Sequence, residues 1–204
     1  MQRIFSFILM LVLSISLVTA CDNKEAEKPK DTVVQEEKSK ENKEENLNNK
    51  EENVEEEIQE GIFPGDKAFD FTLLDREGNE ISLSKLKGKV VFLNFWTSWC
   101  PACIDEMPYI QKVYEKYKDS DVVVLTVNIT AAEKNGIKDT NTFLEKNNYT
   151  FPVLLDTEGE VVKKYRISGI PTTYIIDKDG IIVNLVTGPM NDETMIKQIQ
   201  AAQK

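Results

Sequence analysis

An apolar run that leads directly into two closely spaced cysteines is the feature that most constrains the fold of this chain. Residues 90–95 (Val-Val-Phe-Leu-Asn-Phe) are almost continuously apolar, which is typical of a central strand covered on both faces. The sequence Trp-Cys-Pro-Ala-Cys follows at residues 99–103, and residues 105–117 carry apolar side chains at helical spacing. We therefore expect the two cysteines at a junction between a buried strand and a helix.

Such a junction suits thiol chemistry. The first turn of a helix offers free N–H groups and the positive end of the macrodipole, which stabilise a thiolate. Pro101 fits the first helical position, where a missing N–H costs little. Cys100, nearer the solvent, would attack a partner disulfide, and Cys103, one turn deeper, would resolve the mixed disulfide.

Three other interpretations of the pair compete with this one. A structural disulfide would constrain little at this spacing, and two inert buried thiols are the second alternative. Half of a zinc site is the third, but the chain has no second cysteine pair. The sequence has no histidine, which excludes Ser-His-Asp and Cys-His catalysis and every His-ligated metal site. We expect neither a metal nor a cofactor.

The rest of the pattern predicts an α/β domain with a mixed sheet flanked by helices. A turn at 177–180 (Asp-Lys-Asp-Gly) marks a hairpin near the end of the chain. Apolar spacing predicts further strands at 69–74, 80–83, 122–127, 151–155, 172–176 and 181–186, and helices at 140–147, 158–165 and 191–202.

The first twenty residues form a targeting signal. Arg3 supplies a positive start, and residues 4–18 are apolar apart from three serines. This run is short of the ~20 residues that cross a membrane. The sequence Val-Thr-Ala-Cys at 18–21 resembles a bacterial lipobox, so we expect cleavage before Cys21 and its lipidation. Simple secretion, an uncleaved anchor or an incidental Cys21 thiol are the alternatives.

Residues 21–60 are interpreted as a tether between lipidated Cys21 and the domain at 61–204. Residues 22–60 contain 7 Lys and 15 acidic residues, a net charge of −8, and no aromatic residue. Such a segment buries too little apolar surface to offset its ordering entropy, so we expect a disordered acidic spacer. An acidic docking tail is the alternative. The domain has no basic patch, and nucleic acid is not expected as a partner.

A second motif, Ser-Gly-Ile-Pro-Thr-Thr-Tyr at 168–174, places a proline at the start of a strand. Proline is unusual inside a sheet. A cis Ile170–Pro171 bond would present the Ile170 backbone to an extended peptide, whereas a trans bond would make an ordinary turn.

Together the two motifs resemble those of the ResA/TlpA group of thioredoxin-like proteins, from Ile62 to the C-terminus. The resemblance implies a thioredoxin-like fold with an N-terminal β-hairpin and a central αβ insertion. It also implies that Pro171 is cis and faces the dithiol, and that Cys100 is the nucleophile and Cys103 the resolving thiol. The substrate groove would then consist of Trp99, Pro101, Ile170 and Pro171.

The resemblance assigns a proton carrier as well. Asn94 stands where thioredoxin has a buried aspartate, and an amide cannot exchange a proton. In the ResA/TlpA group a glutamate three residues after the second cysteine is thought to take this role, and Glu106 matches it. The alternative is a surface acid favoured by the start of the helix.

The resemblance further implies a reductant of extracytoplasmic protein disulfides, anchored by lipid at the outer face of the bacterial cytoplasmic membrane. Apocytochrome c or other oxidised envelope proteins would be its substrates, and a membrane thiol transporter of the CcdA type its electron donor. We expect a monomer.

Two other functions stay open. A peroxiredoxin-type peroxidase shares the fold, and Thr97 and Cys100 fit half of its signature, but Leu93 replaces the required proline and Cys103 is too near. A non-enzymatic module would use the dithiol only to bind a partner or a metal.

Overall fold

The computed structural model describes residues 58–204. The predicted signal peptide, Cys21 and nearly all of the tether lie outside the described residues. Within residues 58–204, no helix is both long enough and apolar enough to span a membrane.

Seven strands form a mixed sheet in the order β4-β3-β7-β6-β5-β8-β9. β5 and β6 pair in parallel, as do β6 and β7, whereas the remaining neighbours are antiparallel. The predicted mixed sheet and terminal hairpin are therefore confirmed. The strands are β3 (Thr72–Asp75), β4 (Glu80–Ser82), β5 (Val90–Trp96), β6 (Val122–Asn128), β7 (Val153–Leu155), β8 (Thr172–Ile176) and β9 (Ile182–Thr187).

β5 is the central strand that the sequence predicted. All seven of its residues are buried, and the six apolar ones belong to two hydrophobic clusters, one on each face of the sheet. Phe92 and Trp96 belong to one cluster, and Leu93 and Phe95 to the other. This alternation follows from the period of two along a strand and explains why the run is apolar on both faces.

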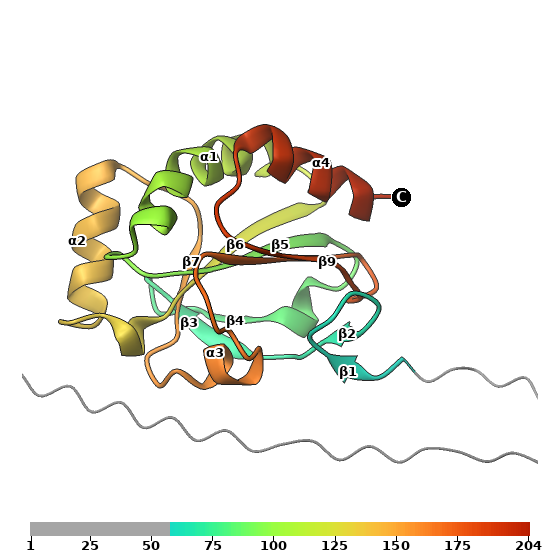
Figure 1. Cartoon of the computed structure of the whole chain (residues 1–204), viewed down its shortest axis with the longest axis horizontal. Coiled ribbons are helices and arrows are strands. Elements are labelled where there is room, and N and C mark those ends of the chain that lie inside the picture. The colour runs from blue at the N-terminus through green and yellow to red at the C-terminus, as the bar shows by residue number, and fades with distance from the viewer. Residues whose placement is uncertain (1–57) are drawn as a thin grey trace, which may run out of the picture. The chain divides into compact units, whose positions relative to one another are not determined.

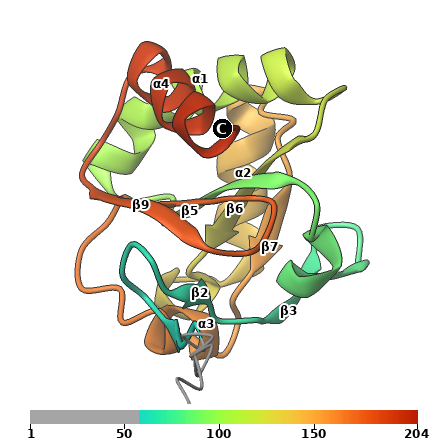
Figure 2. The same ribbon diagram turned by 90° about the vertical axis from the view of Figure 1, so that its right-hand side faces the viewer.

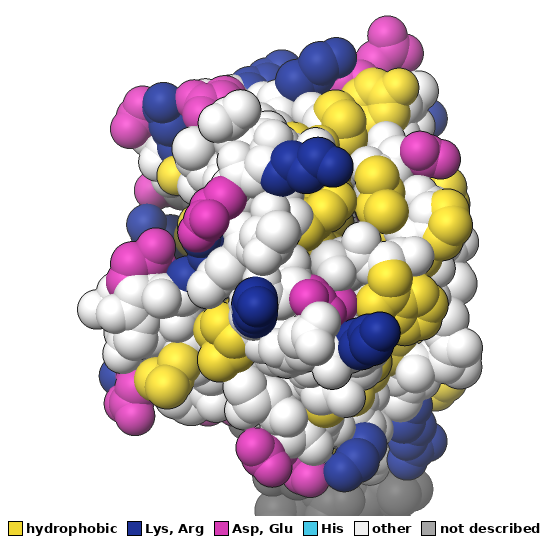
Figure 3. Space-filling model, turned by 90° about the vertical axis from the view of Figure 1, so that its left-hand side faces the viewer, with side chains coloured by type: hydrophobic (Ala, Val, Ile, Leu, Met, Phe, Trp, Pro, Cys, Tyr) yellow, Lys and Arg dark blue, Asp and Glu magenta, His cyan; other side chains and the backbone are white. Residues whose placement is uncertain are grey.

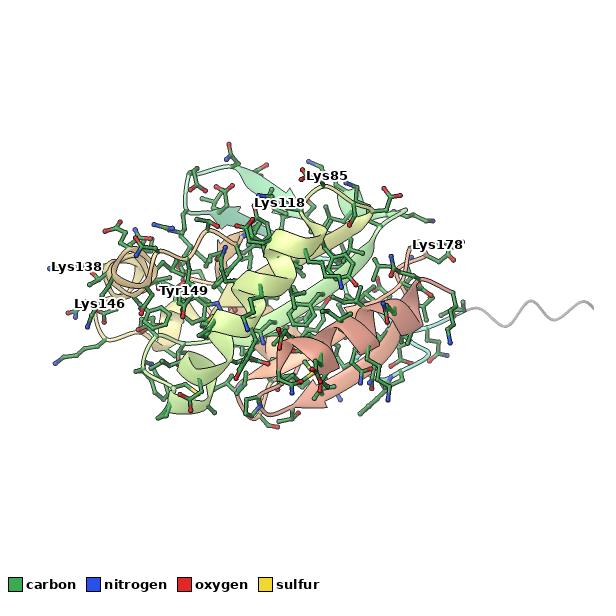
Figure 4. All side chains as sticks on the ribbon, turned by 90° about the horizontal axis from the view of Figure 1, so that it is seen from above. Lys85, Lys118, Lys138, Lys146, Tyr149 and Lys178 are labelled. Atoms are coloured by element: carbon green, nitrogen blue, oxygen red, sulfur yellow. The ribbon has the colours of Figure 1, made fainter. Side chains whose placement is uncertain are left out.

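Helices cover both faces of the sheet. α1 (Pro101–Tyr117) and α4 (Asp192–Ala202) lie side by side on one face (Figures 1 and 4). α3 (Glu160–Lys164) and the short parallel pair β1 (Glu60–Gly61) and β2 (Lys67–Ala68) lie on the opposite face (Figure 2).

α2 (Ile137–Asn147) forms part of the central insertion and lies at one end of the sheet, next to the first turns of α1 (Figure 1). In Figure 4 its exposed residues Lys138 and Lys146 mark this end, and Lys178 marks the other. Leu144 of α2 is buried in the cluster under α1 and α4, whereas Phe143 is half-buried.

The helix ends follow from their capping residues. Pro101 is the first residue of α1, as expected, so this helix begins at the dithiol rather than at Asp105. Asn191 caps α4 by accepting the backbone N–H of Thr194 at 2.9 Å.

The N-terminal hairpin exists, but β3 starts three residues later than the pattern predicted. At this point the Asp70 side chain takes the place of a partner strand, because its Oδ1 accepts the backbone N–H groups of Phe71 and Ser84. Phe71 is buried against the ring of Tyr165. The alternating apolar pattern at this point therefore reflects packing of an irregular segment.

Candidate active site

The dithiol occupies the first turn of α1, directly beyond the end of β5. Cys100 is the N-cap residue, and its sulfur accepts the backbone N–H of Cys103 at 3.4 Å. Both cysteines are unbridged thiols. Cys100 retains 6% of its surface exposed whereas Cys103 has none. The sulfur nearer the solvent thus belongs to Cys100, as the sequence predicted.

The proline loop lies against this sulfur. The Ile170–Pro171 bond is cis, which confirms the expectation from the resemblance. The Cys100 thiol donates to the carbonyl oxygen of Ile170 at 3.7 Å, so the peptide unit before the proline faces the dithiol. Two hydrogen bonds hold the loop: Thr172 Oγ1 donates to the Gly169 carbonyl at 2.7 Å, and Gly188 N donates to the Pro171 carbonyl at 2.8 Å.

Cys103 lies in an environment that resists ionisation. Burial raises the pKa of its thiol, and the hydrogen bond to Cys100 and the negative charges of Cys100 and Glu106 raise this pKa further. A backbone hydrogen bond at Thr97 opposes the shift in part. Release of the Cys103 proton therefore needs an acceptor close by.

Glu106 is placed to be that acceptor. It lies three residues after Cys103 on α1, which puts both side chains on one face of the helix. It is completely buried, so the alternative of a surface acid is wrong. Burial raises the pKa of the carboxyl to about 7, against the opposing effect of two hydrogen bonds. The donors are Met190 N to Oε1 at 2.9 Å and Asn94 Nδ2 to Oε2 at 3.2 Å.

One further group near the dithiol had no signal in the sequence. Glu133 follows the short helix η2 (Thr130–Ala132) and is buried. Its carboxylate accepts the backbone N–H and the hydroxyl of Ser98, each at 2.6 Å, and the Asn128 amide at 2.8 Å. The carboxylate thereby fixes the loop that leads into Cys100. Only the three-dimensional fold brings it there, 35 residues from Ser98 along the chain.

The predicted groove residues differ in their exposure. Trp99 is 57% exposed, and its indole N–H donates to the Ala132 carbonyl at 3.0 Å. Pro101 is exposed, Ile170 is half-buried and Pro171 is buried. Figure 3 views the end of the molecule at which α2 lies and shows hydrophobic side chains gathered along one side of this face. The exposed Trp99, next to Cys100 in the sequence, offers an apolar surface that can receive an extended peptide.

The residues from 58 onward bring together no group of three or more His, Cys, Asp or Glu side chains that could bind a metal.

Comparisons with known proteins identify the family. The chain is 41% identical to the thiol-disulfide oxidoreductase ResA of Bacillus subtilis over 138 residues, which cover 68% of this chain and 74% of that protein. The profile of the AhpC/TSA family matches residues 64–185. The chain belongs to the AhpC/TSA family and is a ResA-like thiol–disulfide oxidoreductase.

Solved structures agree with this assignment. The ResA-like chain matches a putative thiol:disulfide interchange protein DsbE from Chlorobium tepidum with a TM-score of 0.63 and 33% identity, over 70% of this chain and 99% of that one. It also matches the pneumococcal exposed lipoprotein thioredoxin Etrx1 from Streptococcus pneumoniae with a TM-score of 0.59 and 31% identity, over 65% and 99% of the two chains. The thioredoxin-like fold expected from the sequence is confirmed.

Proposed function

We propose that this oxidoreductase reduces disulfides of extracytoplasmic proteins, with Cys100 as nucleophile, Cys103 as resolving thiol and Glu106 as proton carrier. One observation carries the proposal. The Cys100 sulfur lies at the N-terminus of α1, 3.7 Å from the Ile170 carbonyl, while Cys103 and Glu106 are buried behind it. A protein disulfide can reach only the first of these groups.

The reaction consists of two exchanges. The Cys100 thiolate attacks one sulfur of the substrate disulfide, forming a mixed disulfide and releasing the other sulfur as a thiolate. The Cys103 thiolate then attacks the Cys100 sulfur and releases the second substrate thiolate. The substrate gains two electrons, and the protein is left with a Cys100–Cys103 disulfide.

The second exchange requires Cys103 to lose a proton. Its burial disfavours the thiolate, and the Glu106 carboxylate is the adjacent base. A carboxyl whose pKa lies near 7 can accept this proton at neutral pH and return it when the disulfide is reduced again.

Residues beside Cys100 support a peptide as substrate. Trp99 and Pro101 flank Cys100 in the sequence and are exposed, and the Ile170 carbonyl accepts the Cys100 thiol. An extended segment that carries a cystine can lie across these residues, and its backbone can pair with the Ile170 carbonyl once the Cys100 thiol has reacted. Apocytochrome c and other oxidised envelope proteins are the proposed substrates, and a membrane thiol transporter of the CcdA type is the proposed donor.

Membrane attachment through Cys21 is part of the proposal. The lipobox-like Val-Thr-Ala-Cys sequence supports it, and the similar pneumococcal protein is described as an exposed lipoprotein. Two or more acyl chains hold a protein stably, which a single chain does not.

Trapping of the mixed disulfide tests the assignment. The Cys103→Ser variant cannot resolve the intermediate, so it should accumulate disulfide-linked partners in cells, whereas the matched Cys100→Ser variant should accumulate none. Non-reducing electrophoresis and mass spectrometry of the captured species give the readout. Equal trapping by both variants would overturn the roles of the two cysteines, and peroxide consumption by Cys103→Ser would favour the peroxidase instead.

A further inference from the structure

Asn94 lies between the proton carrier and a threonine of the neighbouring strand. Asn94 of β5 and Thr173 of β8 are paired residues of two antiparallel strands and are both completely buried. Asn94 Nδ2 donates to Glu106 Oε2 at 3.2 Å and to Thr173 Oγ1 at 3.0 Å. Its Oδ1 is buried and has no hydrogen-bond partner.

This arrangement suits only one protonation state of Glu106. Both N–H groups of the amide are used when the carboxyl is ionised, because Glu106 and Thr173 each accept one. Glu106 Oε1 already accepts the Met190 N–H, so an added proton is best placed on Oε2, where it would face Nδ2. Two donors would then point at each other.

The amide can remove this conflict by turning over. The outer torsion of an asparagine side chain is broad and roughly two-fold, and the two orientations occupy nearly the same volume. After inversion, Oδ1 would accept the Glu106 proton and the Thr173 hydroxyl at the same two places. Each orientation leaves one end of the amide without a hydrogen-bond partner. The side of the pocket that faces away from Glu106 and Thr173 therefore does not fix the orientation of the amide.

We propose that Asn94 and Thr173 are positioning residues for the proton carrier: the Asn94 amide donates to ionised Glu106, inverts when Glu106 takes a proton and then accepts from it, and Thr173 changes from acceptor to donor in step. The inference rests on the proposed role of Glu106 in disulfide exchange. Its consequence is that both states of the carboxyl keep a hydrogen bond to Asn94 inside the core, so a proton can move between Cys103 and Glu106 without leaving the Glu106 carboxyl unpaired.

The residue types at the two positions fit this role. A hydroxyl can donate or accept, so Thr173 serves both orientations, which an isosteric valine could not. An aspartate at position 94 would place a second titratable group against Glu106, whereas the amide adds no charge. Among the described groups packed against Glu106, Cys103 of α1 is titratable, while β5, β8 and the loop before α4 supply an amide, a hydroxyl and a backbone N–H.

Nuclear magnetic resonance of the reduced full chain tests the inversion. In a ¹⁵N-labelled sample, the Asn94 side-chain protons should show cross-relaxation to the Thr173 methyl group and the Glu106 methylenes at about pH 8.5. These contacts should weaken severalfold at about pH 5.5. The midpoint of this change should coincide with the midpoint at which the chemical shift of the Glu106 carboxyl carbon titrates, near its pKa of about 7. The Glu106→Gln variant should abolish the change. Contacts that are unchanged across the titration would overturn the proposal.

An Asn94→Leu variant gives an independent kinetic readout, since leucine fills the same volume without hydrogen bonds. If the amide only donates, its loss destabilises the carboxylate alone, and the midpoint of the pH–rate profile should rise by about one pH unit. If the amide serves both states, the rate should fall severalfold while the midpoint stays within about 0.3 unit. An Asn184→Leu variant, which removes a half-buried amide bonded to Gln198 instead, is the matched control.

The two proposals fail in different ways. Unchanged amide contacts with normal trapping by Cys103→Ser would reject the inversion and leave the oxidoreductase mechanism intact. Loss of trapping would reject the mechanism whatever the amide does.

Discussion

Glu106 is held in the core by an amide and a backbone N–H rather than by a cation, and this sets how the protein responds to pH. Burial raises the pKa of its carboxyl to about 7. Above that pH the carboxylate can accept the Cys103 proton, and below it the site already holds one.

The first prediction concerns the rate of exchange. For the wild-type protein, single-turnover reduction of a model disulfide should accelerate as pH rises through about 7, because the carboxylate is the base. Glu106→Gln should lose this inflection and be slower by about tenfold to a hundredfold at about pH 8. Stopped-flow kinetics between about pH 6 and pH 9 measure it. Glu115→Gln, an exposed acid on the same helix, is the control. Identical profiles for wild type and Glu106→Gln would make Glu106 structural.

The second prediction concerns stability. The pKa of Glu106 is raised above its unfolded value of about 4.3, so the native state binds an extra proton between these two values. The free energy of unfolding should therefore fall as pH rises, by about 2–3 kcal/mol between about pH 5 and pH 8. Glu106→Gln should lack this loss and be more stable than wild type at about pH 8. Urea unfolding of both reduced proteins gives the comparison, and parallel curves would contradict it.

At the level of single residues, sequence reasoning identified the groups that belong to a continuous motif. Cys100, Cys103 and Pro171 stand in short patterns whose chemistry can be argued from spacing, and Glu106 follows by resemblance. Glu133 could not be found this way, because its partners Ser98 and Asn128 come from other segments. A buried carboxylate that accepts hydrogen bonds from a loop can be recognised only when the three-dimensional position of the loop is known.

Among the elements, the loop between β5 and α1 depends on the segment that follows β6. The Glu133 carboxylate accepts hydrogen bonds from the N–H and hydroxyl of Ser98 and from the amide of Asn128. The Trp99 indole donates to the carbonyl of Ala132, the residue before Glu133. The orientation of the dithiol therefore depends on a contact between two segments remote in the sequence.

A third prediction tests this contact. Glu133→Ala leaves the donors of half-buried Ser98 and buried Asn128 without their partner and should lower the free energy of unfolding by roughly 2–3 kcal/mol. Glu133→Gln can keep all three contacts. Its carbonyl oxygen replaces Oε1, and its side-chain amide donates to the Ser98 hydroxyl, which then accepts a hydrogen bond instead of donating one. Its loss should stay below about 1 kcal/mol. Urea denaturation compares the two variants, and equal losses would show that the negative charge itself is needed.

The long elements were predicted closely and several short ones were found, but the two-residue strands were not. β8 matches its predicted bounds, and β5 and β6 each extend one residue further, since their apolar runs are long and buried on both faces. The pair β1 and β2 has two residues in each strand, too few for any periodic signal. The late start of β3 follows from the Asp70 side chain, which accepts two backbone N–H groups, and the apolar periodicity of the sequence gives no sign of these contacts.

At the scale of the whole molecule, the reactive end of the sheet is where the predicted partners must meet. The proposed reductant would have to receive electrons from one protein and deliver them to another through the same Cys100 sulfur. Attachment to the membrane would keep the domain at a high effective concentration relative to a membrane-bound donor. The proposed lipid on Cys21 would thus affect the flow of electrons in the cell without altering the chemistry of the dithiol.

The last prediction follows from this difference between the flow of electrons in the cell and the chemistry of the dithiol. In a host that processes bacterial lipoproteins, the full chain should fractionate with membranes, whereas Cys21→Ser should be recovered mainly in soluble fractions, because its acyl chains are lost. Purified Cys21→Ser should reduce a model disulfide at the wild-type rate, since Cys100 and Cys103 are unchanged, yet in cells its dithiol should become more oxidised. Fractionation with thiol alkylation measures both effects. A variant that stays with the membrane, or a dithiol that stays as reduced as in the wild type, would count against the lipid anchor as the link to the electron donor.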